Sequence, residues 1–143
     1  MGPALLTYLR RLSRDDETAE DLVQETFARA MAARRRPPDE ELRPWLYRIA
    51  TNLAIDRLRR SRLVRFVSLT RDLPSDAPAD EAEAVRAALR TMDHELAVVL
   101  VLRLHEGFSR AEIARMRGVS ERAVKARLAE ARVAFARAYR GRS

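Results

Sequence analysis

The stretch GVSERAVKARLAEAR, residues 118–132, opens with Gly-Val-Ser and continues as a pattern typical of a helix. The preceding residues, RAEIARMR at 110–117, have the composition of a short helix. Gly118 stands where a tight turn between two helices requires a positive φ, and Ser120 is a good N-cap. Ala114 is small where the two helices would cross closely. The stretch therefore predicts a helix-turn-helix.

The second helix of this motif has an apolar face and a charged face. Ile113, Val124 and Leu128 are apolar where the two helices would pack. The other face carries the charged residues Glu121, Arg122, Lys125, Arg127 and Arg132. Arg and Lys on the first turns of such a helix reach bases or phosphates in the major groove of DNA. A plain packing unit with a solvated basic face is the alternative interpretation.

Composition and charge favour a helical protein with a basic second half. Of the 143 residues, 47% are hydrophobic, 34% are charged and only 4 are Gly. Ala, Leu, Arg and Glu are abundant, and all four are good helix formers. Residues 84–143 carry 13 basic and 6 acidic side chains, a net charge of +7. That excess is typical of a protein that binds a polyanion, although a solvated surface also accounts for it.

Several classes of function are not expected. The chain has no Cys, which excludes disulfides and thiolate metal sites, and its 2 His residues stand apart. We find no catalytic triad, phosphate loop or metal-ligand spacing, so we expect no enzymatic activity, no cofactor and no small-molecule substrate. The longest apolar run, residues 96–102, is too short to span a bilayer, and no signal peptide is evident. We therefore expect a cytoplasmic protein without membrane insertion.

The hydrophobic periodicity predicts helices along the whole chain. In the first half, one predicted helix covers 5–12 and another covers 42–62, with Trp45 on its apolar side. Between them lies a third predicted helix, whose apolar face is formed by Leu22, Val23, Phe27, Ala30 and Met31. A Pro-Pro pair predicts a break over 34–44. In the second half the predicted helices are 81–92, 94–104, 110–116 and 121–139.

The acidic, Pro-rich residues 70–83 read as a connection between two domains. We therefore predict an all-α fold of two small helical domains, 1–66 and 83–143, joined by a flexible linker over 67–82. The second domain would contain the helix-turn-helix.

Three segments, in this order, resemble extracytoplasmic-function (ECF) sigma factors of bacterial RNA polymerase. TAEDLVQETFARAM (18–31) is similar to the polymerase-binding part of sigma region 2. WLYRIATNLAIDRLRR (45–60) is similar to the part of region 2 that engages the −10 promoter element. LAVVLVLRLHEGFSRAEIARMRGVSERAVKARLAEAR (96–132) is similar to region 4, which binds the −35 element.

The resemblance implies partners and sites. The partners would be core RNA polymerase, promoter DNA and an anti-sigma factor. Polymerase would contact Asp21, Leu22, Gln24, Glu25 and Phe27. Trp45 and Tyr47 also match the −10 motif, and the −10 element would contact Arg48, Asn52, Asp56, Arg57, Arg59 and Arg60. The −35 element would contact Ser120, Glu121, Arg122, Lys125, Arg127 and Arg132.

The chain departs from the family pattern in three places, the first of which is a short N-terminus, because the first helix of the family usually begins several residues earlier. Residues 34–44 lack the Phe and Gly that usually precede the −10 motif, and the recognition helix has Ala126, Ala129 and Glu130 at positions that usually hold other residue types. Two alternatives follow. One is a sigma-like decoy or polymerase-docking regulator that does not open promoters. The other is a plain helix-turn-helix transcription regulator that binds a palindrome as a dimer and ignores polymerase.

Overall fold

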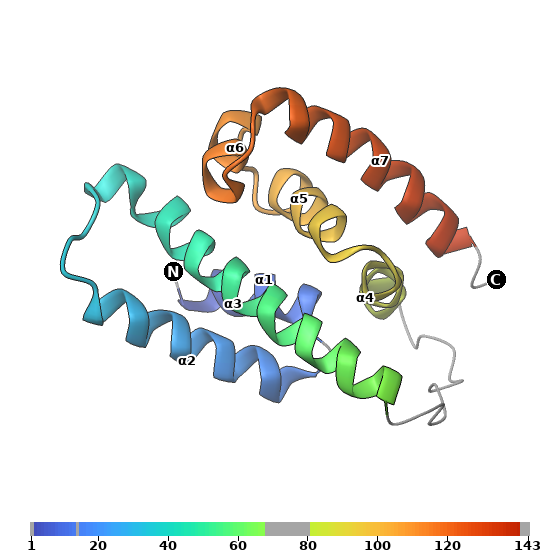
Figure 1. Ribbon diagram of the computed structural model, residues 1–143, viewed down its shortest axis with the longest axis horizontal. Coiled ribbons are helices and arrows are strands. Elements are labelled where there is room, and N and C mark those ends of the chain that lie inside the picture. Colours follow the sequence, from blue (N-terminus) through green and yellow to red (C-terminus); the bar gives the residue numbers. More distant parts are fainter. Residues whose placement is uncertain (1, 14, 68–80, 141–143) are drawn as a thin grey trace.

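The computed structural model describes residues 2–13, 15–67 and 81–140, and all regular secondary structure within them is α-helical (Figure 1). The predicted all-α class is confirmed. The N-terminal half contains α1 (Gly2–Leu12), α2 (Asp16–Ala32) and α3 (Asp39–Val67). The C-terminal half contains α4 (Glu81–Thr91), α5 (His94–Leu104), α6 (Arg110–Arg117) and α7 (Glu121–Arg140).

In the N-terminal half, α1 and α2 both pack against α3. The Asp15 side chain caps α2 by accepting the Thr18 N–H at 2.7 Å, and this hydrogen bond lowers the pKa of the Asp15 carboxyl. The buried Tyr8 hydroxyl of α1 lies 2.6 Å from the Thr51 hydroxyl of α3. This hydrogen bond satisfies two polar groups that would otherwise be unpaired in the core.

Three expectations for this half are wrong. The break after α2 is shorter than 34–44, because α3 begins at Asp39, whose first turn is acidic and therefore favoured at a helix N-terminus. Pro44 consequently lies inside α3. Met31 is 76% exposed rather than on the buried face, and Trp45 is half-buried rather than in the core.

The C-terminal half is built around α5, whose residues from Ala97 to Leu102 are buried. Asp93 caps α5 by accepting the backbone N–H groups of Glu95 and Leu96. Helix α7 packs against α4, α5 and α6. The helix bounds predicted for this half agree with the structure to within one residue at each end.

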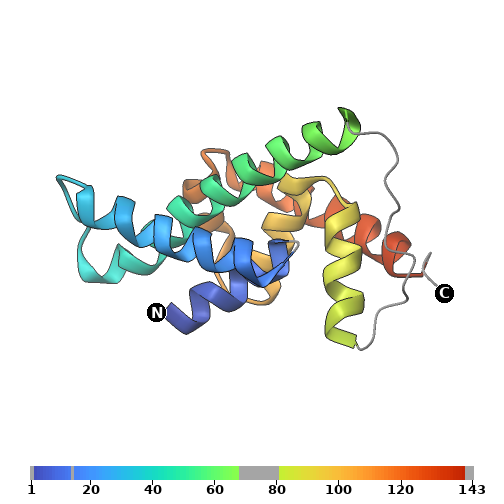
Figure 2. The same cartoon turned by 90° about the horizontal axis from the view of Figure 1, so that it is seen from below.

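The two halves pack against each other through one continuous buried core. Helix α1 contacts α4 and α5, and α3 contacts α5 and α6. Helix α5 lies between α3 and α7 (Figure 1), and Figure 2 shows the same helices from below. Most of the predicted linker, residues 68–80, lies outside the described residues.

Candidate nucleic-acid interface

The turn between α6 and α7 has the geometry of a helix-turn-helix. Gly118 adopts φ 67° and ψ 37°, and its N–H donates to the Ala114 carbonyl. Val119 N–H donates to the same carbonyl at 3.0 Å. The Ser120 hydroxyl then accepts the Ala123 N–H at 3.0 Å and caps α7. The left-handed Gly118, the small buried Ala114 and the Ser120 cap are all confirmed.

Helix α6 is fixed at its other end by a capping box. The Ser109 hydroxyl accepts the Glu112 N–H at 3.1 Å, and the Glu112 carboxylate accepts the Ser109 N–H at 2.8 Å. Ile113, Val124 and Leu128 are buried between α6, α7 and α5, as predicted. The orientation of α7 relative to α6 is therefore set by the caps at the N-termini of both helices and by the apolar side chains packed between the helices.

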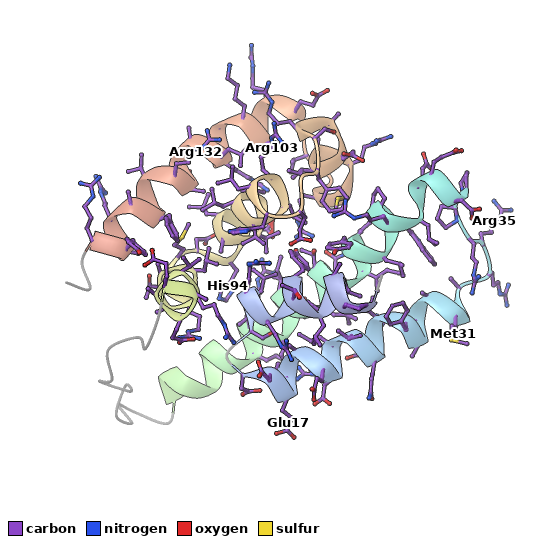
Figure 3. All side chains as sticks on the ribbon, turned by 180° about the vertical axis from the view of Figure 1, so that it is seen from behind. Glu17, Met31, Arg35, His94, Arg103 and Arg132 are labelled. Carbon is purple, nitrogen blue, oxygen red and sulfur yellow. The ribbon has the colours of Figure 1, made fainter. Side chains whose placement is uncertain are left out.

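The outward face of α7 carries most of the basic residues that the sequence selected. Glu121, Arg122 and Lys125 are exposed on its first turns. Arg132, two turns further on, is also exposed and projects from α7 (Figure 3). A convex helix with free guanidinium and ammonium groups at its N-terminal end fits a DNA major groove.

Two other predicted members of this face have structural partners. Arg127 is half-buried, and its Nη1 lies 3.5 Å from the Glu95 carboxylate of α5. The Ser120 hydroxyl oxygen accepts a backbone hydrogen bond, as described above. These two side chains help to hold α7 in place, and the exposed basic residues are the better candidates for contact with phosphate.

The predicted −10 residues lie along one side of α3. Arg48, Asn52, Asp56, Arg59 and Arg60 are exposed, and Arg57 is half-buried within 4.0 Å of Glu25 of α2. Tyr47, which also matches the motif, is buried and faces the C-terminal half. The side is mostly basic, as a surface that follows a nucleic-acid backbone requires.

The predicted polymerase-docking residues lie on α2. Asp21 and Gln24 are exposed, while Glu25 and Phe27 are half-buried. Leu22 is 1% exposed, so it is a core residue and not a contact residue, because the helical repeat turns it toward α1 and α3. Glu17 and Met31 project outward from the two ends of α2 (Figure 3).

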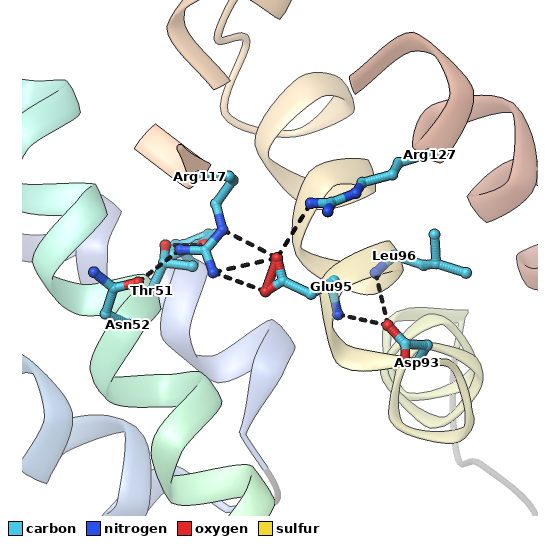
Figure 4. Close-up of polar contacts among 8 residues, drawn as sticks. Thr51, Asn52, Asp93, Glu95, Leu96, Arg117 and Arg127 are labelled. Carbon is cyan, nitrogen blue, oxygen red and sulfur yellow. Dashed lines mark hydrogen bonds and ion pairs between the residues drawn. The ribbon is translucent and has the colours of Figure 1, made fainter. Parts of the chain in front are cut away.

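The sequence analysis missed Arg117, which joins three helices. The Arg117 Nη2 lies 2.7 Å from the Glu95 carboxylate of α5, and its Nη1 donates to Asn52 Oδ1 of α3 at 2.7 Å (Figure 4). Only 9% of its side chain is exposed. No local pattern marks this residue, because its partners lie 22 and 65 positions away in the chain.

Two further observations concern metal-ligating groups and membrane-spanning helices. Within residues 2–13, 15–67 and 81–140 there is no group of three or more His, Cys, Asp or Glu side chains that could hold a metal ion. In the same ranges no helix has both the length and the hydropathy to cross a membrane.

Comparison with family models gives two matches that together span most of the chain. Sigma-70 region 2 matches residues 1–64, and sigma-70 region 4 matches residues 82–135. The first match includes the α2 and α3 surfaces, and the second includes the helix-turn-helix.

Similar proteins and structures are known. RNA polymerase sigma factor CarQ of Myxococcus xanthus is 35% identical over 88% of this chain and 77% of its own. ECF RNA polymerase sigma factor SigM of Mycobacterium tuberculosis is 36% identical over 90% of this chain and 67% of its own. The sigma factor RpoE of Bartonella quintana, solved with the anti-sigma factor NepR, has a TM-score of 0.80 at 25% identity, covering 97% of this chain and 91% of its own. CnrH, solved with the cytosolic domain of CnrY, has a TM-score of 0.75 at 30% identity, covering 99% of this chain and 84% of its own.

Proposed function

The chain belongs to the ECF sigma factors of the sigma-70 family, and from that premise we propose how its three surfaces direct promoter-specific transcription initiation. The exposed face of α2 binds core RNA polymerase. The exposed side of α3 binds the −10 element, and the first turns of α7 bind the −35 element. The halves at 1–66 and 83–143 act as separable domains.

The single observation that carries the proposal is the geometry of the turn before α7. A left-handed Gly118 and a serine cap present the start of α7 to solvent, with Arg122 and Lys125 exposed on it. A helix used only for packing has no need of an exposed basic N-terminal turn, because the helix dipole disfavours cations there. Phosphate groups of DNA compensate for this unfavourable placement.

The side of α3 fits a different form of DNA. Arg48, Arg59 and Arg60 supply positive charge for a strand backbone, and the Asn52 amide supplies a donor and an acceptor for a base edge. Half-buried Trp45 lies one turn before Arg48 and Ile49 on the same helix, where an aromatic ring could stack on an unpaired base.

The face of α2 fits a basic helical partner. Asp21 and Gln24 are exposed beside half-buried Phe27, and exposed Met31 extends the face by one turn. An acidic surface with apolar side chains at its centre binds a partner through complementary charge and apolar burial.

An anti-sigma factor is the proposed negative regulator. RpoE, whose structure this chain resembles over nearly its whole length, was solved with the anti-sigma factor NepR, and CnrH was solved with the cytosolic domain of CnrY. The proposed site of action is the cytoplasm, with RNA polymerase. Sigma factors are not enzymes, and we assign this chain no catalytic activity of its own.

Run-off transcription tests the proposal. The protein is mixed with sigma-free core polymerase and genomic DNA of its own bacterium, and the transcripts are sequenced. Discrete new start sites that share −35 and −10 elements are expected. If the protein co-elutes with core polymerase but starts no transcripts, the proposal fails in favour of a docking regulator. The segment between α2 and α3, which lacks the usual Phe and Gly, would explain that result.

A matched pair of variants tests the −35 assignment. Lys125→Ala should weaken binding to a duplex that carries the −35 element of a promoter found by run-off transcription. It should also reduce the slope of log K against log salt by about 1, because one phosphate contact is lost. Arg137→Ala, exposed in the last turn of the same helix, is the control and should leave the slope unchanged. Equal slopes for both variants would contradict the assignment.

A further inference from the structure

The first turn of α5 carries one carboxylate, Glu95, that binds both helices of the helix-turn-helix. Arg117, in the last turn of α6, donates from Nη2 to Glu95 Oε2 at 2.7 Å and from Nε to Oε1 at 3.3 Å. Arg127, in the second turn of α7, donates from Nη1 to the same Oε1 at 3.5 Å. One carboxylate therefore joins three helices (Figure 4).

The three charges of this ion cluster lie where their attraction is effective. The side chains of Arg117, Glu95 and Arg127 are 9%, 24% and 32% exposed. Glu95 belongs to the first turn of α5 and Arg117 to the last turn of α6, so each charge lies at the helix end whose dipole favours it. A guanidinium that bonds both oxygens of a carboxylate fixes an orientation as well as a distance.

The ion cluster adds a directional constraint to the apolar packing of α6 and α7. The apolar side chains between the helices are buried, but hydrophobic burial is non-directional. Arg127 follows Glu121, the first residue of α7, by six positions, or about 9 Å of helix. A tilt of about 10° at Arg127 therefore moves the first turn of α7 by about 1.6 Å. Specific contacts do not tolerate such a displacement.

Glu95 also separates two like charges. The guanidiniums of Arg117 and Arg127 both bond to the same carboxylate oxygen, so they are close neighbours. Within the residues that the structure describes, no other carboxylate pairs with either arginine. Without Glu95 the two cations would repel each other in a partly buried place, where the repulsion is stronger than in water. The repulsion would act across the turn between α6 and α7.

The pairing gives Arg127 a different role from the neighbouring basic residues. Positions two apart on a helix point about 200° from each other, so Arg127 faces nearly the opposite side from exposed Lys125. Arg122 and Lys125 are three positions apart and share the exposed side. Arg127 therefore orients α7, while Arg122 and Lys125 face the DNA.

We propose that Glu95 is the positioning residue of the recognition helix α7. By holding Arg117 and Arg127 on one carboxylate, it fixes the angle at which the first turn of α7 meets the base edges. Removal of this carboxylate leaves the phosphate contacts in place and lowers sequence discrimination. The inference rests on the proposed binding of the −35 element by α7. It adds that Arg127 acts through Glu95 and does not contact DNA.

Hydrogen exchange in the unbound full chain tests the structural part of this proposal without DNA. The N–H groups of Gly118 and Val119 donate to the Ala114 carbonyl and report on the turn before α7. Glu95→Gln should speed their exchange several-fold, because repulsion between the two arginines favours opening of the turn. Glu83→Gln removes the same charge from an ion pair with a neighbouring arginine of α4, and should leave the exchange unchanged.

Binding to two duplexes tests the effect on sequence discrimination. One duplex, of about 20 base pairs, is selected by the unmodified chain from a random-sequence pool, and the other is its scrambled form. Glu95→Gln should lower the ratio of the two affinities about tenfold, a loss comparable to that from one misread base pair. Its affinity for the scrambled duplex should stay within about twofold, because Arg122 and Lys125 remain exposed. Glu83→Gln should keep the ratio of the unmodified chain.

Arg127 provides a second variant and a rescue. Arg127→Gln should leave the slope of log K against log salt unchanged, whereas the loss of a phosphate contact lowers that slope by about 1. Combined with Glu95→Gln, it removes the repulsion and should recover about threefold of the lost discrimination. A residue that contributed only to stability would give additive losses instead. If Glu95→Gln loses helix content by circular dichroism, the salt slope and the affinity ratio of Arg127→Gln decide the matter.

The possible contradictions are distinct. Unchanged exchange at the turn in Glu95→Gln would overturn the positioning role. Faster exchange with an unchanged affinity ratio would overturn the role in discrimination, and a lower salt slope for Arg127→Gln would return Arg127 to the DNA contacts. A pool that yields no preferred sequence would contradict the −35 assignment of α7 itself. The exchange measurement uses no DNA, so it separates a failure of Glu95 from a failure of the proposed function.

Discussion

The helix-turn-helix and the boundary between the two halves are two regions held together by contacts of very different range. In the turn before α7, Val119 bonds to Ala114 and Ser120 caps the N–H of Ala123, so the partners are five and three residues apart. At the boundary, Arg43 donates to the Glu106 carbonyl 63 residues away, and Arg117 donates to Asn52, 65 residues away. Contacts of the first kind close short loops and form with the helices themselves.

Contacts of the second kind form only when both halves have already folded and met. The difference teaches that the DNA-reading unit is a local structure, whereas the packing of the halves depends on the whole fold. Variants should therefore separate the stability of the turn from the stability of the boundary.

The largest expected effect comes from Phe108, an aromatic residue buried where the two halves meet. Phe108→Ala should lower the free energy of unfolding by about 3–5 kcal/mol, because the 1% exposed ring leaves a cavity between Tyr47 and α5. Urea unfolding followed by circular dichroism measures the loss. Leu104→Ala, four residues earlier and 57% exposed, should change it by less than about 0.5 kcal/mol. Comparable losses in both variants would show that Phe108 does not join the halves.

A matched pair of glycines separates the two regions directly. Gly118 in the turn before α7 and Gly107, which lies between Glu106 and Phe108, both have positive φ, 67° and 75°, and both have open space where a Cβ would lie. Alanine at either position should cost about 1–2 kcal/mol of backbone strain. Only Gly118→Ala should weaken binding to the −35 duplex, because Gly107 lies outside the helix-turn-helix. If Gly107→Ala weakened that binding equally, the turn and the boundary would be one cooperative unit.

The smallest expected effect is a pH dependence at the boundary between the halves. Burial, and then the positive charge of Arg11, lower the pKa of His105 from its usual 6.5, while neighbouring Glu106 opposes the shift. The unfolded chain therefore takes up this proton at a higher pH than the folded chain does. Stability contributed by neutral His105 should be complete above 6.5 and decline as the pH falls through the window just below it.

Urea unfolding between about pH 7.5 and about pH 5 measures this dependence, with His105→Gln as the comparison. The variant should have a flatter profile than the unmodified chain. Identical profiles would mean that protonation of His105 does not change the free energy of unfolding.

The local features of the C-terminal half could be predicted well because their causes are local. The left-handed Gly118, the Ser120 cap and the buried Ile113, Val124 and Leu128 each follow from residue type and helical spacing. The predictions failed at two helix ends in the N-terminal half. Helix α3 begins at its acidic first turn, before Pro44, and therefore includes that proline. Met31 belongs to the apolar stripe of α2 but lies beyond the point where a neighbouring helix covers it.

The candidate surfaces were predicted only in outline. Each of α2, α3 and α7 has exposed charged residues that were selected from the sequence, such as Asp21, Arg48 and Lys125, since helical periodicity separates exposed from buried positions. The sequence did not show which of the selected side chains are paired or buried within the molecule. Arg127 turns toward Glu95, 32 residues away in the chain, whereas Leu22 lies in the core on the apolar face that helical spacing had already indicated.

The sequence by itself determined the all-helical class, the helix-turn-helix, the family and the basic faces, because each depends on residues that are close together along the chain. The tertiary structure alone decided that the halves close on each other, that Glu106 is buried among Arg11, Arg43 and Tyr47, and that Arg117 holds Asn52. Those contacts join residues from the two separate halves. Whether they form depends on the free energy of packing folded helices together, which no local spacing of residue types records.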